Sequence, residues 1–250
     1  MEVLLNPVLR FIRFPMNSRR LHSGAAAGLI LAAAILLYSL GRPPAANAGP
    51  APGARPAEEA SITFRKTFKS SYPEFTEIKI TESGSGTYDI RQLDDDPAPQ
   101  AFEMGAPVVQ KIFDLASKLH NFQGIDLEVH RRLANLGEKT FRYEKGAEKH
   151  DVTFNYTLDT TAAQLLQTFE GIARQELDLA DLQRTMRYDH LGVNDVIRQI
   201  ESDYNAKILP EPQRFLIILD QLATDQKFID IARQRAASLA ARIRSSSSAY

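Results

Sequence analysis

The sequence predicts an α+β fold: an antiparallel sheet of about five strands with one packing helix, followed by a C-terminal group of three to four helices. Apolar and polar residues alternate over residues 62–91 and again over 140–156, which is the period of a half-buried strand. Turn-forming residues separate these runs. From residue 159 onward apolar residues recur every three or four positions, as in helices that bury one face.

The first part of the predicted sheet covers residues 62–104. Ile62, Phe64 and Phe68 point one way in the first strand, and Ile78 and Ile80 do so in the second. Residues 83–86, Ser-Gly-Ser-Gly, then turn the chain into a third strand, with glycine supplying positive φ. Residues 94–97, Asp-Asp-Asp-Pro, form another turn, and residues 101–104 are expected to add a short fourth strand.

A helix and a second hairpin follow. Residues 107–122 place apolar side chains on one stripe, and Pro107 suits the first turn of a helix. Phe141 and Tyr143 are expected to pair across a turn at Gly146 with the apolar residues of a second strand, which are Val152, Phe154 and Tyr156.

The rest of the chain is predicted to be helical. Thr160 or Thr161 can cap a helix whose apolar residues run to Ala173, and further helices are expected around 193–204, 215–223 and 228–243. We therefore divide the folded part into a sheet with one helix at 61–158 and a helical part at 159–244. The first helix is expected to cover the apolar face of the sheet, and the helical part to pack beside it on the same domain or to form an annexed bundle. Residues 245–250, which are mostly serine, are predicted to be disordered.

An antiparallel sheet can leave one face in water, so the outward side chains are the candidate interaction surface. That predicted face includes Arg65, Lys79, Arg91 and Arg142, interspersed with Glu77, Asp89 and Glu144. A mixed-charge face of this kind usually does no more than contact solvent. If it is a site, it suits a peptide, a glycan or a protein partner.

The N-terminal 48 residues have the order of a secretory signal. Four arginines precede an apolar run of 17 residues, Gly24 to Leu40, and the Ala46-Asn47-Ala48 tripeptide follows as a cleavage site with Ala46 and Ala48 at its small positions. As a helix the run spans roughly 25 Å, slightly less than a hydrocarbon core of about 30 Å. We favour the interpretation that this segment is a cleaved signal peptide. The alternative is that it is an uncleaved membrane anchor.

In both interpretations the residues after the leader are exported to the far side of the membrane, because the basic N-terminal segment stays in the cytoplasm. Met16 offers a second start that gives a shorter lead, and Ser18-Arg19-Arg20 resembles part of a twin-arginine signal. Residues 49–60 are rich in proline and alanine and read as a linker. The predicted location is therefore the periplasm or the extracytoplasmic face of the inner membrane.

The net charge and the cysteine content of the chain limit the classes of partner and the location that we expect. Residues 1–48 hold five of the 30 basic and one of the 31 acidic residues, so the remaining 202 carry a net charge of about −5. A mildly acidic domain does not attract phosphates, so nucleic acid is not expected as a partner. The chain has no cysteine and thus neither a disulfide nor a lipid-bearing cysteine, which fits a bacterial envelope protein.

No motif predicts a catalytic residue, a cofactor or a metal. Gly137-Glu138-Lys139-Thr140 resembles the tail of a phosphate-binding loop, but position 132 is arginine where that loop needs glycine, so a turn into a strand is expected. Downstream of the leader, the histidines have none of the short spacings that local zinc ligation needs; they are His120, His130, His150 and His190. No Gly-x-Ser-x-Gly elbow is present either.

Four strings resemble an uncharacterised group of exported bacterial proteins: Phe-Lys-Ser-Ser-Tyr-Pro-Glu-Phe at 68–75, Lys-Thr-Phe-Arg-Tyr at 139–143, Phe-Asn-Tyr-Thr at 154–157 and Tyr-Asp-His-Leu-Gly-Val at 188–193. The resemblance covers most of residues 62–244. It implies export and one shared domain, and it implies no activity and no functional residue.

The sequence thus favours an exported domain that binds an envelope protein, peptide or glycan without catalysis. Before cleavage, or without it, its N-terminal segment would also hold it in the membrane. The alternatives are an envelope hydrolase whose site forms only in three dimensions, for instance around His130 or His150, and a structural envelope protein.

Overall fold

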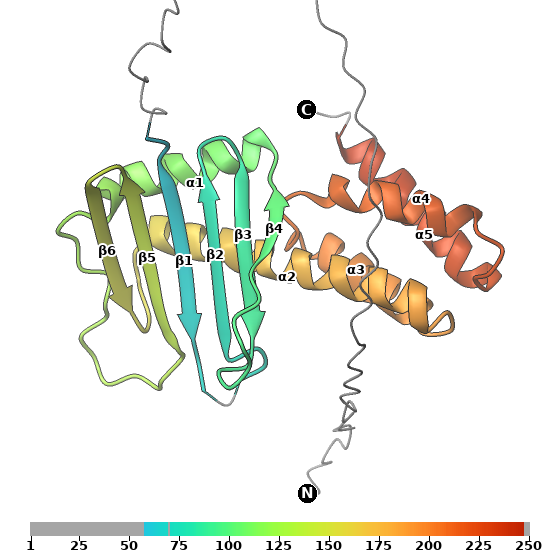
Figure 1. The fold of residues 1–250 in the computed structure, drawn as a ribbon, viewed down its shortest axis with the longest axis horizontal. Coiled ribbons are helices and arrows are strands. Elements are labelled where there is room, and N and C mark those ends of the chain that lie inside the picture. The colour runs from blue at the N-terminus through green and yellow to red at the C-terminus, as the bar shows by residue number, and fades with distance from the viewer. Residues whose placement is uncertain (1–57, 70, 248–250) are drawn as a thin grey trace, which may run out of the picture. The chain divides into compact units, whose positions relative to one another are not determined.

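Six antiparallel strands form a single sheet in the order β4-β3-β2-β1-β5-β6 (Figure 1). The computed structural model describes residues 58–69 and 71–247. The predictions for the leader and most of the linker lie outside these residues. The strands are β1 (Ser61–Thr67), β2 (Phe75–Thr81), β3 (Ser85–Arg91), β4 (Gln100–Glu103), β5 (Glu138–Lys145) and β6 (Glu148–Phe154).

The alternating pattern puts most of the apolar strand residues on one face, with Phe75 and Ala101 as exceptions on the other. Ile62 lies between Ile80 and Tyr143 in the register, and Phe64 lies between Ile78 and Phe141. These side chains are buried, while their neighbours along each strand point to the other face. The predicted α+β class and the antiparallel sheet are confirmed, with a sixth strand.

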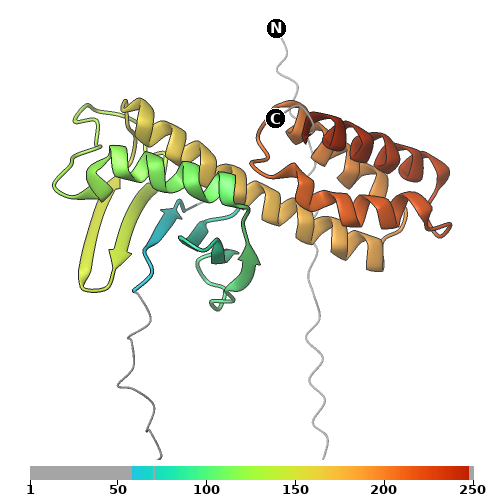
Figure 2. The same cartoon turned by 90° about the horizontal axis from the view of Figure 1, so that it is seen from above.

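Two helices cover the apolar face: the packing helix that was predicted there and the first of the C-terminal helices, which were expected to pack beside it or to form an annexed bundle. Helix α1 (Ala106–Lys118) and the first half of α2 (Thr160–Tyr188) lie side by side against it (Figure 2). Phe169 of α2 stacks on Phe64 with ring centroids 5.4 Å apart. Helix α2 is present as predicted, but its cap is Asp159 instead of Thr160 or Thr161: the Asp159 side chain accepts a hydrogen bond from the backbone N–H of Ala162.

Two predicted boundaries in the sheet region are wrong. The helix predicted over 107–122 ends at Lys118, because His120, Asn121 and Phe122 take positive φ values of 52°, 49° and 69°. The backbone there turns so that Phe122 enters the core. Tyr156 was assigned to the second hairpin, but β6 ends at Phe154 and Tyr156 is exposed.

A second apolar core lies among the C-terminal helices. The second half of α2 packs there with α3 (Val193–Asn205), the 3-10 turn η2 (Pro212–Phe215), α4 (Leu216–Thr224) and α5 (Asp230–Ser247). Helix α5 continues through Ser247, so residues 245–247 of the tail predicted to be disordered are helical, while residues 248–250 lie outside the described part of the chain. The terminal turn of α5 is held by the Ser245 and Ser246 hydroxyls, which donate to the carbonyls of Arg242 and Ile243. Among the described residues, no helix is both long and apolar enough to cross a membrane.

Buried charges join α2 to α3. Arg174 Nε lies 2.6 Å from Asp203 Oδ2 and 3.3 Å from Asp178 Oδ1. The second oxygen of Asp178 is buried without a hydrogen-bond partner. Burial raises the pKa of Asp178 to about 7; Arg174 opposes the rise, and Asp203 adds to it.

This carboxyl predicts a pH-dependent stability. A folded-state pKa above the unfolded value of 3.8 means that the folded chain holds a proton which the unfolded chain has lost. The stabilisation that Asp178 contributes to the folded state is therefore complete below about pH 4 and is lost as the pH rises through about 7. Allowing for solvent screening, Asp178 should lower the free energy of unfolding by about 1–2 kcal/mol between pH 5 and pH 8.

Urea unfolding of the full chain at both pH values, followed by circular dichroism, measures this. Asp178→Asn should remove that part of the pH dependence. Asp195→Asn, which removes an exposed carboxylate in the first turn of α3, should keep the wild-type dependence. Equal pH dependence in wild type and Asp178→Asn would contradict the assignment.

Candidate functional site

The face of the sheet opposite α1 and α2, which we call the open face, is the candidate site. None of the described helices covers it (Figures 1 and 2). By register its described strands place eight hydroxyl side chains on it; Ser61 is buried, and the seven that are exposed or half-buried are Thr63, Thr67, Thr81, Ser85, Thr87, Thr140 and Thr153. Its five basic side chains are Arg65, Lys79, Arg91, Arg142 and Lys149. Its six acidic side chains are Glu77, Asp89, Glu103, Glu138, Glu144 and Asp151.

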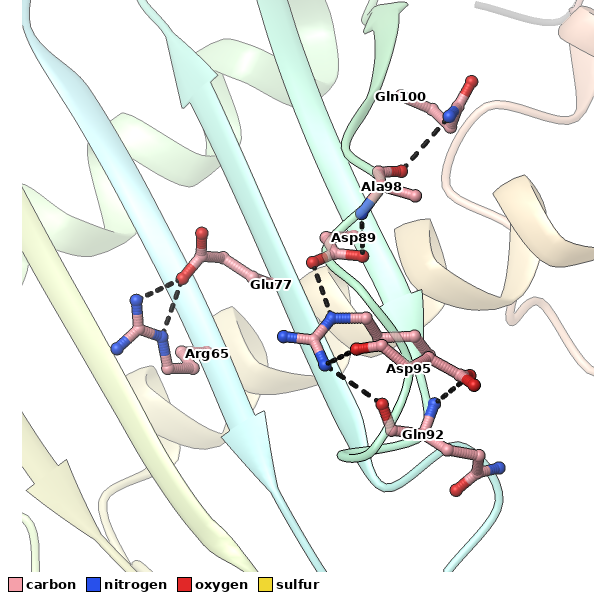
Figure 3. A network of polar contacts seen from close by, with 8 residues as sticks. Arg65, Glu77, Asp89, Gln92, Asp95, Ala98 and Gln100 are labelled. Carbon is pink, nitrogen blue, oxygen red and sulfur yellow. Dashed lines mark hydrogen bonds and ion pairs between the residues drawn. The ribbon is translucent and has the colours of Figure 1, made fainter.

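A polar network orders one half of the open face (Figure 3). The guanidinium of Arg65 contacts Glu77 Oε2 on the neighbouring strand, at 2.7 Å from Nε and 2.5 Å from Nη2. Arg91 Nε donates to Asp89 at 2.9 Å, and its Nη1 donates to the carbonyls of Gln92 and Asp95. Arg91 therefore fixes the loop between β3 and β4 as well as the face.

Phe75 is the one aromatic side chain of the open face. It is half-buried and lies opposite Arg91 in the register. The Arg91 guanidinium carbon is 4.4 Å from the ring centroid and that of Arg65 is 6.0 Å away. The two arginines thus hold the ring in place by cation–π contacts.

The other half of the face is held by Glu144. Lys149 and Lys79 place their ammonium groups 3.0 and 3.3 Å from its carboxylate oxygens. Hydrogen bonds from Lys149 and then Lys79 lower the pKa of Glu144 despite some burial. Arg142 is exposed and has no ion pair or hydrogen bond with the described residues.

All four predicted interaction residues therefore project from the open face, in two groups. Arg65 and Arg91 meet at Phe75. Lys79 and Arg142 lie in one cross-strand row, with Thr63 between them. Arg65, Lys79 and Arg91 form ion pairs with carboxylates. Within the described part of the chain, Arg142 alone among the four has an unpaired charge.

A hollow continues the open face at the end where β1 finishes and β5 begins. Its volume is about 620 Å³. Thr67, Glu138 and Thr153 of the strands line it, together with Lys69 after β1 and with Glu128, Leu133 and Asn135 of the loop before β5. The cross-strand row Glu138–Thr67–Phe75–Arg91 joins the hollow to the aromatic ring.

The loop beside the hollow is held by buried polar groups. The Lys139 ammonium donates to the carbonyls of Leu136, Gly137 and Asn155 at 2.7–3.0 Å. Burial lowers the pKa of Lys139. Gly137 has a φ of 89°, and a Cβ there would lie 2.7 Å from Cβ of Phe68. The segment is thus a turn into β5, as predicted, and its lysine binds backbone carbonyls.

The histidines lie apart from the hollow. His130 Nε2 is 2.7 Å from Asp126 Oδ2, and both side chains are exposed. Its pKa is raised, chiefly by that hydrogen bond. His150 lies 3.1 Å from Glu148, and His190 packs edge-on against Phe228. Within the described residues, no group of three or more histidine, aspartate or glutamate side chains could hold a metal ion.

Sequence reasoning missed Phe75 and the hollow. The parity of Ile78 and Ile80 places Phe75 on the outward side, so an apolar residue at an outward position was a usable signal. The hollow had none, because it joins strand ends to a loop that lacks periodicity. The chain matches no protein-family model, and no curated protein is significantly similar to it in sequence.

Proposed function

We propose that this protein is an exported, non-catalytic binding protein that engages a component of the cell envelope through the open face of its sheet. The observation that carries the proposal is that face itself: it is broad, polar and left uncovered by the described helices, which all lie elsewhere. The N-terminal signal-like segment supports the location.

The order of the face supports binding. Its ion pairs and the Arg–Phe75 contacts hold side chains in fixed positions on a sheet that is backed by two helices. Groups held this way lose little conformational entropy when a partner binds. Arg142 and Thr63 lie near the middle of the face and are available for contacts.

Site-specific photo-crosslinking of the full chain in its native cells tests the proposal. A photoreactive phenylalanine analogue at Thr63 or Arg142 should give discrete adducts. The same analogue at Lys111 or Ser117, exposed on α1, should not. No adduct from the face, or equal adducts from α1, would refute the proposal.

A charge-matched pair of variants sharpens this test. With the crosslinker at Thr63, Arg142→Glu should reduce the adduct at least fivefold, because it replaces the unpaired donor group in the middle of the face with an acceptor-only carboxylate. Lys111→Glu makes the same charge change on α1 and should leave the adduct within twofold of its original yield. Equal effects of the two variants would show that net charge, and not the face, controls the reaction.

A further inference from the structure

We infer that the partner of the open face is a neutral glycan chain, and that the hollow at its end binds one or more sugar units. The inference rests on the proposed function and names its ligand. The hollow, at about 620 Å³, has the size of small-molecule sites, which range over roughly 300–1,000 Å³.

The hollow offers hydrogen-bonding groups that the described protein does not use. The ammonium of Lys69, the carboxylate of Glu138 and the hydroxyl of Thr67 have no partner among the described residues. Asn135 uses its side-chain oxygen to accept from Gly137 N at 2.9 Å, which leaves its NH₂ group available. Donors and acceptors are therefore mixed within one cavity.

A sugar hydroxyl fits such a mixed set, because it donates one hydrogen bond and accepts others. The ring carbons of a sugar need an apolar contact in addition. Leu133 supplies one, since it lines the hollow and is 45% exposed. Along the cross-strand row from the hollow, Phe75 offers a second apolar contact for the next part of a chain.

The charge of the face favours a neutral ligand. Its five basic and six acidic strand side chains nearly cancel, and most of the basic ones already contact carboxylates. An anionic polymer would have to displace those carboxylates and would gain no long-range attraction. The seven exposed or half-buried hydroxyl side chains of the face suit a neutral ligand that also presents hydroxyl groups.

Direct binding by the full chain tests the inference. The probes are cellohexaose, maltohexaose and N-acetylchitohexaose, compared with polygalacturonate and with a neutral Ser/Thr/Asn decapeptide. Isothermal titration calorimetry should show saturable binding of at least one neutral hexasaccharide, and 0.5 M NaCl should change its affinity less than twofold. Binding of the polyanion or the decapeptide alone, or of no probe, would overturn the inference.

Two matched pairs of variants locate the site. Thr67→Val and Glu138→Gln, both in the hollow, should each weaken the affinity about fivefold or more, the loss of one hydrogen bond. Thr160→Val at the start of α2 and Glu82→Gln in the β2–β3 turn make the same chemical changes at exposed positions away from the face, and should change affinity less than twofold. Equal effects of hollow and control variants would refute the hollow as the site.

The two proposals fail in different ways. If photo-adducts form from Thr63 and Arg142 but contain protein, and no hexasaccharide binds, the glycan inference is wrong while the binding function stands. If neither adducts nor binding are found, both are wrong. Unchanged thermal unfolding of each variant confirms that a loss of binding reflects the site.

Discussion

Phe141→Ala is expected to lower the free energy of unfolding by about 3–5 kcal/mol, the cost of truncating a fully buried phenylalanine. Phe141 is completely buried in β5, and its ring meets four others: Phe64, Phe122, Phe154 and Phe169, at centroid distances of 5.4–6.1 Å. These rings come from the sheet, from the 3-10 turn η1 (His120–Phe122) and from α2. Removing the central ring leaves a cavity that none of these elements can close alone.

Urea unfolding of the full chain by circular dichroism measures the effect, with Phe75→Ala as the matched control. Phe75 is half-buried on the open face, so its loss should cost about 1–2 kcal/mol. If the two variants are equally destabilised, Phe141 is not the centre of the core. The result also bears on binding, because Phe141 lies between Thr140 and Arg142, whose positions on the open face depend on it.

The strands could be predicted because their signal is local. The alternation of apolar and polar residues within β1, β2 or β5 is enough to show that one face of the strand is buried and the other is in water. The register then aligns the apolar residues of neighbouring strands, as it aligns Phe64 with Ile78 and Phe141. The central pairing of β1 with β5 was not predicted. It joins residues more than seventy positions apart, and nothing in either strand marks the other as its neighbour.

The extent of α2 could not be predicted for a related reason. Its apolar stripe breaks after Ala173, where Arg174 follows and where Gln175, Glu176 and Asp178 occupy positions that the structure buries. Buried polar residues resemble exposed ones in a sequence. Only their partners, Asp203 for Arg174 and Arg214 for Glu176, explain why the helix continues as one element through both cores.

The candidate site divides in the same way. Arg65, Lys79, Arg91 and Arg142 could be assigned to one face from parity alone. Their ion pairs could not be predicted. Arg65 and Lys79 pair with carboxylates on other strands, only Arg91 pairs within its own strand, with Asp89, and Arg142 has no ion pair among the described residues. The role of Arg91 in fixing the 92–95 loop depends on backbone carbonyls, which carry no sequence signal.

Arg214→Met is expected to cost about 3–5 kcal/mol of stability at pH 8, because it leaves a buried carboxylate without its partner. Arg214 of η2 pairs with Glu176 of α2 through both terminal nitrogens of its guanidinium: Nη1 contacts Oε1, and Nη2 lies 3.2 Å from Oε2. The side chain of Glu176 is only 5% exposed. The same guanidinium lies 5.7 Å from the Phe102 ring of β4, so the pair connects the sheet edge to the helical part.

The cost should depend on pH. Burial already raises the pKa of Glu176, and Arg214 opposes that rise. Without Arg214 the folded-state pKa rises further, so the folded chain retains a proton that the unfolded chain loses. The penalty should therefore be smaller at pH 5 than at pH 8, because protonation removes the buried charge.

A double variant separates the lost pair from lost packing. Glu176→Gln combined with Arg214→Met removes both charges and should recover most of the stability at pH 8, to within about 1–2 kcal/mol of wild type. Arg198→Met breaks an exposed pair with Asp195 and should cost no more than about 1 kcal/mol. If Arg214→Met costs no more than Arg198→Met, or if the double variant is no more stable than Arg214→Met alone, the buried charge is not what holds η2 against α2.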